Sequence, residues 1–172
     1  MGFFNDISKI NIIYIFLLYI IKISCNSKSL IKLNKISEIT IKTKCSGNCT
    51  IISSSYSGIL PNYFIYQGIS QNFTNDYINL NPGINEITFV WNEEITSCQN
   101  MFYCTNIIEA DLSKFNMSLI TDSSYMFYAC SFLTSINLNN VNASSLHNMD
   151  NMFRCCHTLK LLNLKTLGFI IN

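Results

Sequence analysis

The stretch TDSSYMFYACSFLTSINL, at positions 121–138, occurs three times along the chain in altered form. The other copies lie at residues 96–112 and 147–164. Three apolar columns recur at one constant spacing of twenty-six positions: Ile107, Leu133 and Leu159; Ala110, Ile136 and Leu162; Leu112, Leu138 and Leu164. A fixed period with apolar residues in fixed columns is typical of a solenoid, in which each repeat buries its apolar face against its neighbours.

Each repeat ends in an L-x-x-I-x-L pattern, which reads LTSINL in the middle copy. The alternation predicts one short strand per repeat, with Ile136 and Leu138 in the core and Asn137 at the surface. Stacking in register gives a parallel sheet with about 4.8 Å between strands. Phe127 is expected in the same core.

A further column contains Cys104, Cys130 and Cys156, which follow one another at the same spacing. We expect these three thiols to be free and buried, because free cysteine packs well as a small hydrophobic residue. The first repeat is one residue short, and the sequence places the gap at Ala129.

Residues 37–94 have the pattern of a small antiparallel β unit. Apolar and polar residues alternate at 39–44 and 87–92. Further strands are expected at 50–53, 63–67 and 77–80, with a hairpin turn at 46–48 and a loop at 68–75. Five short strands separated by turn residues indicate a sandwich-like unit. It would cover the end of the first repeat, with Trp91 either as the covering side chain or as an ordinary core residue.

The N-terminus carries the pattern of a secretory signal peptide at residues 1–25. Residues 12–21, IIYIFLLYII, form an unbroken apolar run that ends before Lys22 and is followed by small residues. The run is short for a membrane span, which needs about 20 apolar residues. An uncleaved membrane anchor and a buried helix are the alternatives. We therefore expect a secreted or cell-surface protein with a polar linker at residues 26–36.

Export changes the interpretation of the eight cysteines. Cys45 and Cys49 bracket Ser46-Gly47-Asn48, and a short loop with glycine sets its two ends opposite each other. A disulfide between them is expected in an oxidising compartment. Sequons for N-glycosylation are compatible with export, although about four arise by chance in so Asn-rich a chain. They stand at Asn48, Asn72, Asn116 and Asn142.

Catalytic and metal-binding signals are weak. Cys155-Cys156-His157 is the only Cys/His cluster, and consecutive residues near a strand point in different directions, whereas a nucleophile and its base must converge. The cluster also lacks the number of ligands that a structural metal needs. The net charge of +1 gives no case for nucleic acid. We expect no enzyme, no metal and no cofactor.

The repeat resembles the BspA-like leucine-rich repeats, a family found at the surface of bacteria and unicellular eukaryotes. Residues 111–138, DLSKFNMSLITDSSYMFYACSFLTSINL, carry the closest match, and the neighbouring copies match less well. The resemblance implies a leucine-rich-repeat solenoid at residues 95–172, a role in adhesion and binding, and no catalytic residues. Arrays in this family run for many repeats, whereas this chain stops in its third.

The exposed face of the repeat strands is the predicted binding surface, for a protein or glycan partner. Its two columns are Glu109, Ser135 and Leu161, and Asp111, Asn137 and Asn163. A plain solvated face is the alternative for each position. A second hypothesis is a truncated structural remnant of a longer repeat protein without independent activity. The last repeat is expected either to be covered by Phe169-Ile170-Ile171 or to self-associate, because its apolar residues would otherwise meet water.

Overall fold

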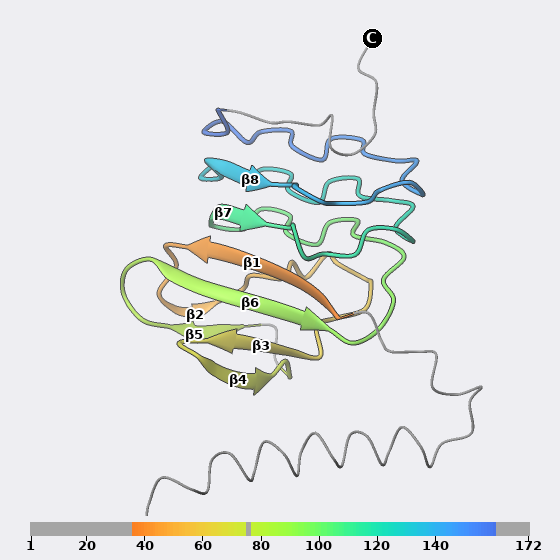
Figure 1. Ribbon diagram of the computed structural model, residues 1–172. Coiled ribbons are helices and arrows are strands. Elements are labelled where there is room, and N and C mark those ends of the chain that lie inside the picture. Colours follow the sequence, from red (N-terminus) through yellow and green to blue (C-terminus); the bar gives the residue numbers. More distant parts are fainter. Residues whose placement is uncertain (1–35, 75–76, 161–172) are drawn as a thin grey trace, which may run out of the picture. The chain divides into compact units, whose positions relative to one another are not determined.

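The computed structural model describes residues 36–74 and 77–160, and all regular elements in these ranges are strands (Figure 1). The prediction of a mainly β protein is confirmed. The predictions of a signal peptide at residues 1–25, of a linker at 26–36 (apart from Ile36) and of a covered or self-associating last repeat lie outside the described residues. So do Leu161, Leu162, Asn163 and Leu164.

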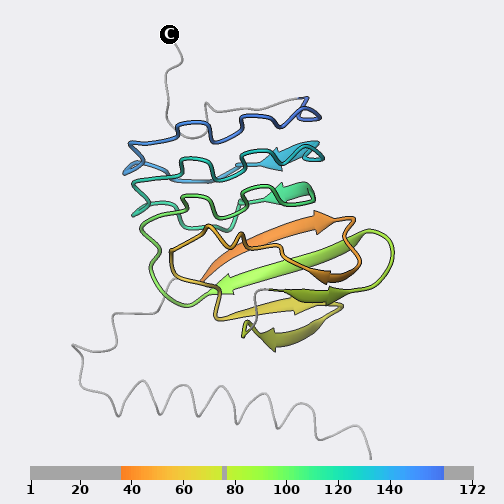
Figure 2. The same ribbon diagram turned by 180° about the vertical axis from the view of Figure 1, so that it is seen from behind.

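A mixed six-stranded sheet contains most of the strands, in the order β4-β3-β6-β1-β7-β8 (Figures 1 and 2). Neighbours from β4 to β7 are antiparallel, and β8 is parallel to β7. The sheet is therefore continuous from the β unit into the repeats, with β1 pairing β6 on one side and β7 on the other. The bounds are β1 Ser37–Thr43, β3 Tyr63–Tyr66, β4 Ile69–Asn72, β6 Asn85–Trp91, β7 Ile107–Asp111 and β8 Ser135–Asn137.

Alternation decides which face of β1 and β6 is buried. In β1 every second residue is buried, and Ile39 and Ile41 are fully so, whereas the residues between them are half-buried. Ile87 and Phe89 of β6 have no exposed surface either. This is the period of two that a sheet with one covered face requires.

The segment around the two bridging cysteines differs from the predicted hairpin. Strand β2 is Gly47–Cys49, not residues 50–53, and it pairs antiparallel with β5, Ile78–Leu80, in a separate two-stranded sheet. The strand begins inside the predicted turn, so the turn does not join two paired strands. The disulfide instead spans a tight loop whose second half pairs with a distant segment.

A hairpin also replaces the loop predicted at residues 68–75. Strands β3 and β4 are joined by Gln67 and Gly68, which have φ angles of 51° and 75°. Positive φ at both central residues is the conformation of a type I′ turn, whose twist matches that of the flanking strands. All four residues of β4 are exposed. The strand therefore lacks the alternation of buried apolar and exposed polar residues from which a strand is predicted.

The repeats lie one above another and exchange backbone hydrogen bonds. Cys98 donates from its amide to the Asp122 carbonyl at 2.8 Å, and Ser123 does the same to Asn148 at 2.9 Å.

The rings of Phe102, Phe127 and Phe153 stack in one column, with centroids 5.2 and 5.7 Å apart. Phe127 and Leu138 are buried, as predicted, while Ile136 is only partly buried against the core.

The predicted cysteine column is wrong in its first member. Thr105, not Cys104, contacts Cys130, with 3.6 Å between the Thr105 hydroxyl oxygen and the Cys130 sulfur. Cys104 is exposed, whereas Cys130 is buried and Cys156 is half-buried. Cys104 aligns with Ala129 and Cys155, and all three have positive φ angles, of 57°, 57° and 63°.

The missing residue of the first repeat therefore lies later than predicted. One residue, Asn106, separates Thr105 from Ile107, whereas Ser131 and Phe132 separate Cys130 from Leu133. Before this point the first two repeats are offset by 25 positions, as in the contact between Thr105 and Cys130. After it the offset is 26, as between Asp111 and Asn137 in the β7–β8 register. The extra residue is accommodated at the surface, where Phe132 is 58% exposed.

Trp91 lies in the core that the β unit shares with the residues following β7. Its indole is fully buried, and Nε1 donates to the Ile59 carbonyl at 2.8 Å. The indole packs against Phe89 of the same strand, with ring centroids 6.3 Å apart, and edge-on against Phe115 at 5.5 Å. Trp91 is therefore an ordinary core residue, one of its two predicted roles, and its covering of the end of the first repeat stays a prediction.

Candidate binding face

Two rows of side chains cross the same face of the six-stranded sheet. Each row takes one residue from β6, β1, β7 and β8 in turn, and the second row lies two positions along each strand from the first. The rows are Glu86, Lys42, Glu109 and Ser135, and Thr88, Thr40, Asp111 and Asn137.

A surface depression of about 520 Å³ lies over these rows and takes in all of their residues except Thr88. Glu38, Ser113, Lys114 and Asn139 also line it. The β1–β7 pair is irregular between Lys42 and Thr43, and a bulge of this kind bends a strand and increases its twist. The volume lies in the range of about 300–1,000 Å³ that is usual for ligand sites.

The lining of the depression carries six charged side chains beside the apolar Ile41, Ala110, Ile136 and Leu138, and it lacks aromatic side chains. Its charged groups are four carboxylates and two ammonium groups, a net charge of −2. This contrasts with the net charge of +1 for the whole chain. The face therefore differs electrostatically from the average surface of the protein.

Asp111 is held in a fixed position on this face. Its Oδ1 accepts the backbone N–H of Ser113 at 2.8 Å and the side-chain amide of Asn137 at 3.1 Å. Burial alone would raise the pKa of Asp111, but the hydrogen bonds from Ser113 and Asn137 and the nearby Lys114 charge outweigh it and lower the pKa. The carboxylate is therefore ionised at neutral pH.

Two ion pairs span the depression. Lys42 Nζ lies 2.8 Å from Glu109 Oε2, and Lys114 Nζ lies 3.3 Å from Glu38 Oε2. The hydrogen bond and charge of Glu109 raise the pKa of Lys42. The paired side chains are 30–76% exposed, and exposed pairs of this kind contribute about 0–1 kcal/mol each to stability. They can therefore be exchanged for contacts with a ligand at little loss.

Four of the six residues predicted to form the binding surface line the depression: Glu109, Asp111, Ser135 and Asn137. Leu161 and Asn163 lie outside the described residues. Whether the four bind a partner stays a prediction. The contribution of β1 to this face was not predicted, because Lys42 and Glu109 are 67 positions apart in the sequence. The polar alternation of Glu38, Thr40 and Lys42 was a usable signal.

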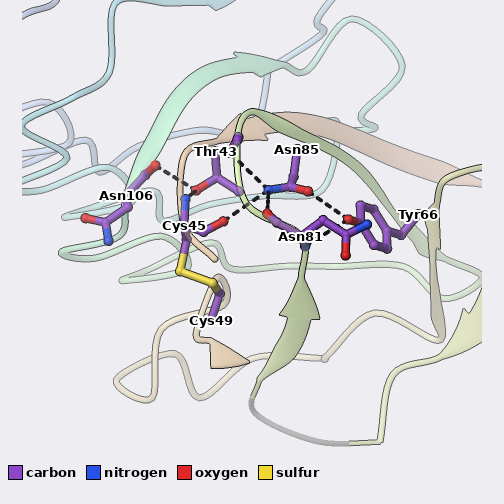
Figure 3. Close-up of a disulfide and its surroundings, with 8 residues drawn as sticks. Thr43, Cys45, Cys49, Tyr66, Asn81, Asn85 and Asn106 are labelled. Atoms are coloured by element: carbon purple, nitrogen blue, oxygen red, sulfur yellow. Dashed lines mark hydrogen bonds between the residues drawn. A yellow bond between two sulfur atoms is a disulfide. The ribbon is translucent and has the colours of Figure 1, made fainter. Parts of the chain in front are cut away.

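The Cys45–Cys49 disulfide is formed, as predicted, and lies beside a buried polar cluster (Figure 3). The side-chain amide of Asn85 donates to the carbonyls of Cys45 and Asn81, at 3.1 and 2.9 Å, while its Oδ1 accepts the Tyr66 hydroxyl at 2.7 Å. Thr43 donates from its hydroxyl to the Asn106 carbonyl at 2.8 Å. The cluster therefore ties the disulfide loop to β6 and to the first repeat.

The sequon asparagines are mostly accessible. Asn48, Asn72 and Asn142 are exposed, and Asn116 is half-buried. The Asn116 side chain accepts the hydroxyl of Ser118, its own sequon residue, at 2.8 Å. None of the four lines the depression. Glycosylation at any of them would leave the depression lining itself unmodified.

In the part of the chain that the structure describes, the cysteine and histidine side chains do not form a cluster of reactive groups. Cys156 donates from its thiol to the Phe127 carbonyl at 3.0 Å, and burial raises its pKa to about 11. His147 is a surface residue whose Nδ1 contacts the Ser145 carbonyl. Within residues 36–74 and 77–160 no three His, Cys, Asp or Glu side chains come together as metal ligands.

The protein is therefore mainly β. Its sequence repeats extend a mixed sheet, and a charged depression lies where the sheet of the β unit meets the repeat strands. The chain belongs to the family described as "Mycoplasma protein of unknown function, DUF285", whose model matches residues 69–165. No curated protein and no solved structure matches the chain. A helix able to cross a membrane does not occur in the part of the chain that the structure describes.

Proposed function

We propose that this chain is a secreted or cell-surface binding module that takes a protein or glycan partner in the depression over β6, β1, β7 and β8. The observation that carries the proposal is the meeting of Glu109, Asp111, Ser135 and Asn137 in one depression of about 520 Å³. A polar concave face on a rigid sheet holds its side chains in place before a partner arrives, which limits the entropy lost on binding.

The finer architecture belongs to the same proposal: a short leucine-rich-repeat solenoid of the BspA-like kind, with residues 37–94 as its antiparallel cap. Three observations support it. The β7–β8 pair is parallel, and its partners Asp111 and Asn137 are one repeat apart. Ser97, Asp122 and Asn148 form parallel bridges one above another. The phenylalanine rings stack in a continuous column.

Inserting a second copy of residues 113–138 directly after Leu138 tests this architecture. A solenoid accepts an additional repeat and gains stability from the new interface. We expect a folded protein with a raised thermal midpoint and one further protected strand in amide hydrogen exchange. A chain that unfolds on insertion would argue for a closed fold instead of an extendable array.

Three of the five free cysteines in the described residues are unsuited to nucleophilic catalysis, which favours binding over a reaction at these thiols. Cys98 and Cys130 are buried, and burial raises the pKa of both thiols. Cys156 is bonded to a carbonyl oxygen. Protonated, enclosed thiols are poor nucleophiles, because the thiolate is the reactive form.

Blocking the depression tests the binding function. Ser135 is exposed and lines the depression, so Ser135→Trp fills it without touching the core. Ser54→Trp, at an exposed turn outside the depression, is the matched control. We expect the labelled full chain to bind members of a panel of extracellular proteins and glycans, and Ser135→Trp alone to lose that binding. Equal binding by both variants would move the function to another surface.

Export is tested on the protein from its native host. N-terminal sequencing is expected to begin between Asn26 and Ser29, immediately after the proposed signal peptide. Recovery of the chain in the cytosol with Met1 intact would overturn the proposed localisation.

A further inference from the structure

We propose that the partner segment bound in the depression is basic: an extended peptide stretch that presents a Lys or Arg side chain to Asp111. This inference rests on the proposed binding function and adds the chemistry of the partner to it. It is carried by the charge of the lining, the hydrogen bonding of Asp111 and the size of the face.

The charge of the lining selects a cation. Four carboxylates face two ammonium groups, and each ammonium group is already paired, Lys42 with Glu109 and Lys114 with Glu38. Asp111 and Glu86 are the carboxylates left over. An acidic partner would meet this excess of negative charge, whereas a basic one neutralises it, and charge complementarity of this kind governs partner choice and encounter rate.

Asp111 is the receiving group because half of its carboxylate is free within the described part of the chain. Both of its hydrogen bonds there, from the Ser113 amide and the Asn137 side chain, end on Oδ1. These bonds fix the carboxylate while Oδ2 keeps its capacity to accept. A carboxylate that is held in place and ionised forms charge-assisted hydrogen bonds with guanidinium or ammonium groups.

The dimensions suit a peptide. The distance from β6 to β8 is three strand spacings, about 14 Å, which an extended stretch of about four residues covers. Sugar-binding sites usually offer an aromatic ring for stacking, and none of the residues that line this depression is aromatic. So small a face binds weakly by itself, and several copies displayed together would strengthen the attachment.

The existing ion pairs give the face a built-in competitor. Lys114 is 76% exposed and lies near both Glu38 and Asp111, so an incoming cation displaces it at little loss. Removing Lys114 is therefore expected to strengthen binding of a basic peptide, and removing Asp111 to weaken it.

The test uses the full chain and three synthetic octapeptides of alternating glycine with arginine, glutamate or glutamine. Binding is followed by amide chemical shifts at 50 and 500 mM salt. Asp111→Asn is the principal variant, and Asn fits there because Asn137, the equivalent residue of the next repeat, makes the same turn with the Asn139 amide. Asp122→Asn is the matched control. Asp122 also accepts an amide two residues on and the side chain of an Asn one repeat later, but it does not line the depression.

We expect the arginine peptide to perturb β7 and β8, with affinity lowered about fivefold by Asp111→Asn, raised by Lys114→Gln and unchanged by Asp122→Asn. High salt should weaken it, since screening acts on exposed charges. Perturbation of the same strands by the glutamate or glutamine peptide but not by the arginine peptide would overturn the basic partner while leaving the binding face intact. No perturbation by any peptide overturns this inference, and the Ser135→Trp experiment then decides the binding function separately.

Discussion

The hydroxyl of Thr105 and the thiol of Cys130 meet in the core, 3.6 Å apart, although the two residues differ in type and stand 25 positions apart. Both are also within hydrogen-bonding distance of the Phe102 carbonyl, at 2.9 Å for Thr105 and 3.0 Å for Cys130. One repeat later, the Cys156 thiol donates to the Phe127 carbonyl in the same way. The buried column is therefore defined by a donor that reaches the phenylalanine carbonyl, not by cysteine as such.

Replacing Cys130 with alanine should destabilise the fold, and replacing Cys104 with alanine should not. Cys130→Ala removes a buried donor and leaves a small void, for which we expect a loss of about 1–2 kcal/mol in the free energy of unfolding. Cys104 is exposed, and Ala129 already occupies the equivalent position, so Cys104→Ala should change it by less than about 0.5 kcal/mol. Urea unfolding of the full chain under reducing conditions measures both, and equal losses would restore the column built on Cys104.

Truncation of the stacked phenylalanine should be among the most destabilising single changes. Phe127 is fully buried between Phe102 and Phe153, so Phe127→Ala is expected to lower the free energy of unfolding by about 3–5 kcal/mol. Asn137 is half-buried and bonded to Asp111 and to the Asn139 amide. Asn137→Ala should therefore lose about 1 kcal/mol, which is more than a free surface residue would. Denaturant titrations of the two variants that gave the same loss would place the strand phase one residue off.

The disulfide should stabilise the fold modestly. Cys45 and Cys49 are four positions apart. Closing so short a loop lowers the conformational entropy of the unfolded chain only slightly, which corresponds to a stabilisation of about 2 kcal/mol. Replacing both cysteines with alanine is expected to lower the free energy of unfolding by that amount. Adding a thiol reductant should lower the wild-type thermal midpoint and leave that of the double variant in place. If the reductant left the thermal midpoint of the wild type unchanged, the conformation of the loop would depend on the hydrogen bonds of the Asn85 cluster and not on the disulfide.

High pH should destabilise the reduced protein through its buried thiols. Burial, together with the charge of Asp122, raises the pKa of Cys98 in the folded state. Below the ordinary thiol pKa the group is protonated in both states and has no effect. Above it, the unfolded chain releases a proton that the folded chain keeps, so stability falls as pH rises, by about 1.4 kcal/mol per pH unit for this thiol.

The slope isolates the effect of Cys98. Between pH 9.5 and 11 we expect the free energy of unfolding of Cys98→Ala to fall less steeply with pH than that of the wild type, whatever its absolute value. The ionisation of the lysines and of the tyrosines that are not coupled to Cys98 contributes equally to both proteins and cancels in the comparison. Tyr56 is the exception, because burial and, to a smaller extent, the Cys98 charge raise its pKa, so its contribution belongs to the measured difference. Parallel slopes would show that the Cys98 thiol ionises in the folded state.

The strands of the β unit were predictable where one face is buried. Ile39 and Ile41 alternate with polar neighbours because the core lies on one side only, and this pattern is legible in the residues themselves. Strand β4 carries no such pattern, since all four of its residues are exposed and its place is decided by the turn at Gln67 and Gly68. Local conformation, not hydrophobicity, forms that strand.

About half of the candidate binding face was predictable for a similar reason. The constant period of the repeats identifies Glu109, Asp111, Ser135 and Asn137 as neighbours, because stacked repeats place identical positions side by side. No period relates β1 to β7, so the arrival of Lys42 beside Glu109 depends on a long-range antiparallel pairing. The prediction of the cysteine column was wrong because the first repeat is one residue short. Counting 26 positions back from Cys130 gives Cys104, whereas the backbone hydrogen bonds between the repeats place Thr105 beside Cys130.

The position of β1 in the middle of the sheet has a consequence for synthesis. β1 ends at Thr43, and its partner β7 begins at Ile107. At about 5–20 residues per second, a ribosome therefore completes β1 several seconds before β7 is synthesised. During that interval β6 can occupy one side of β1, while the other side keeps its amides and carbonyls open to any passing strand. Until the first repeat arrives, the nascent chain presents the edge on which the whole array is to be built, and a chaperone or a neighbouring nascent chain has the first opportunity to occupy it.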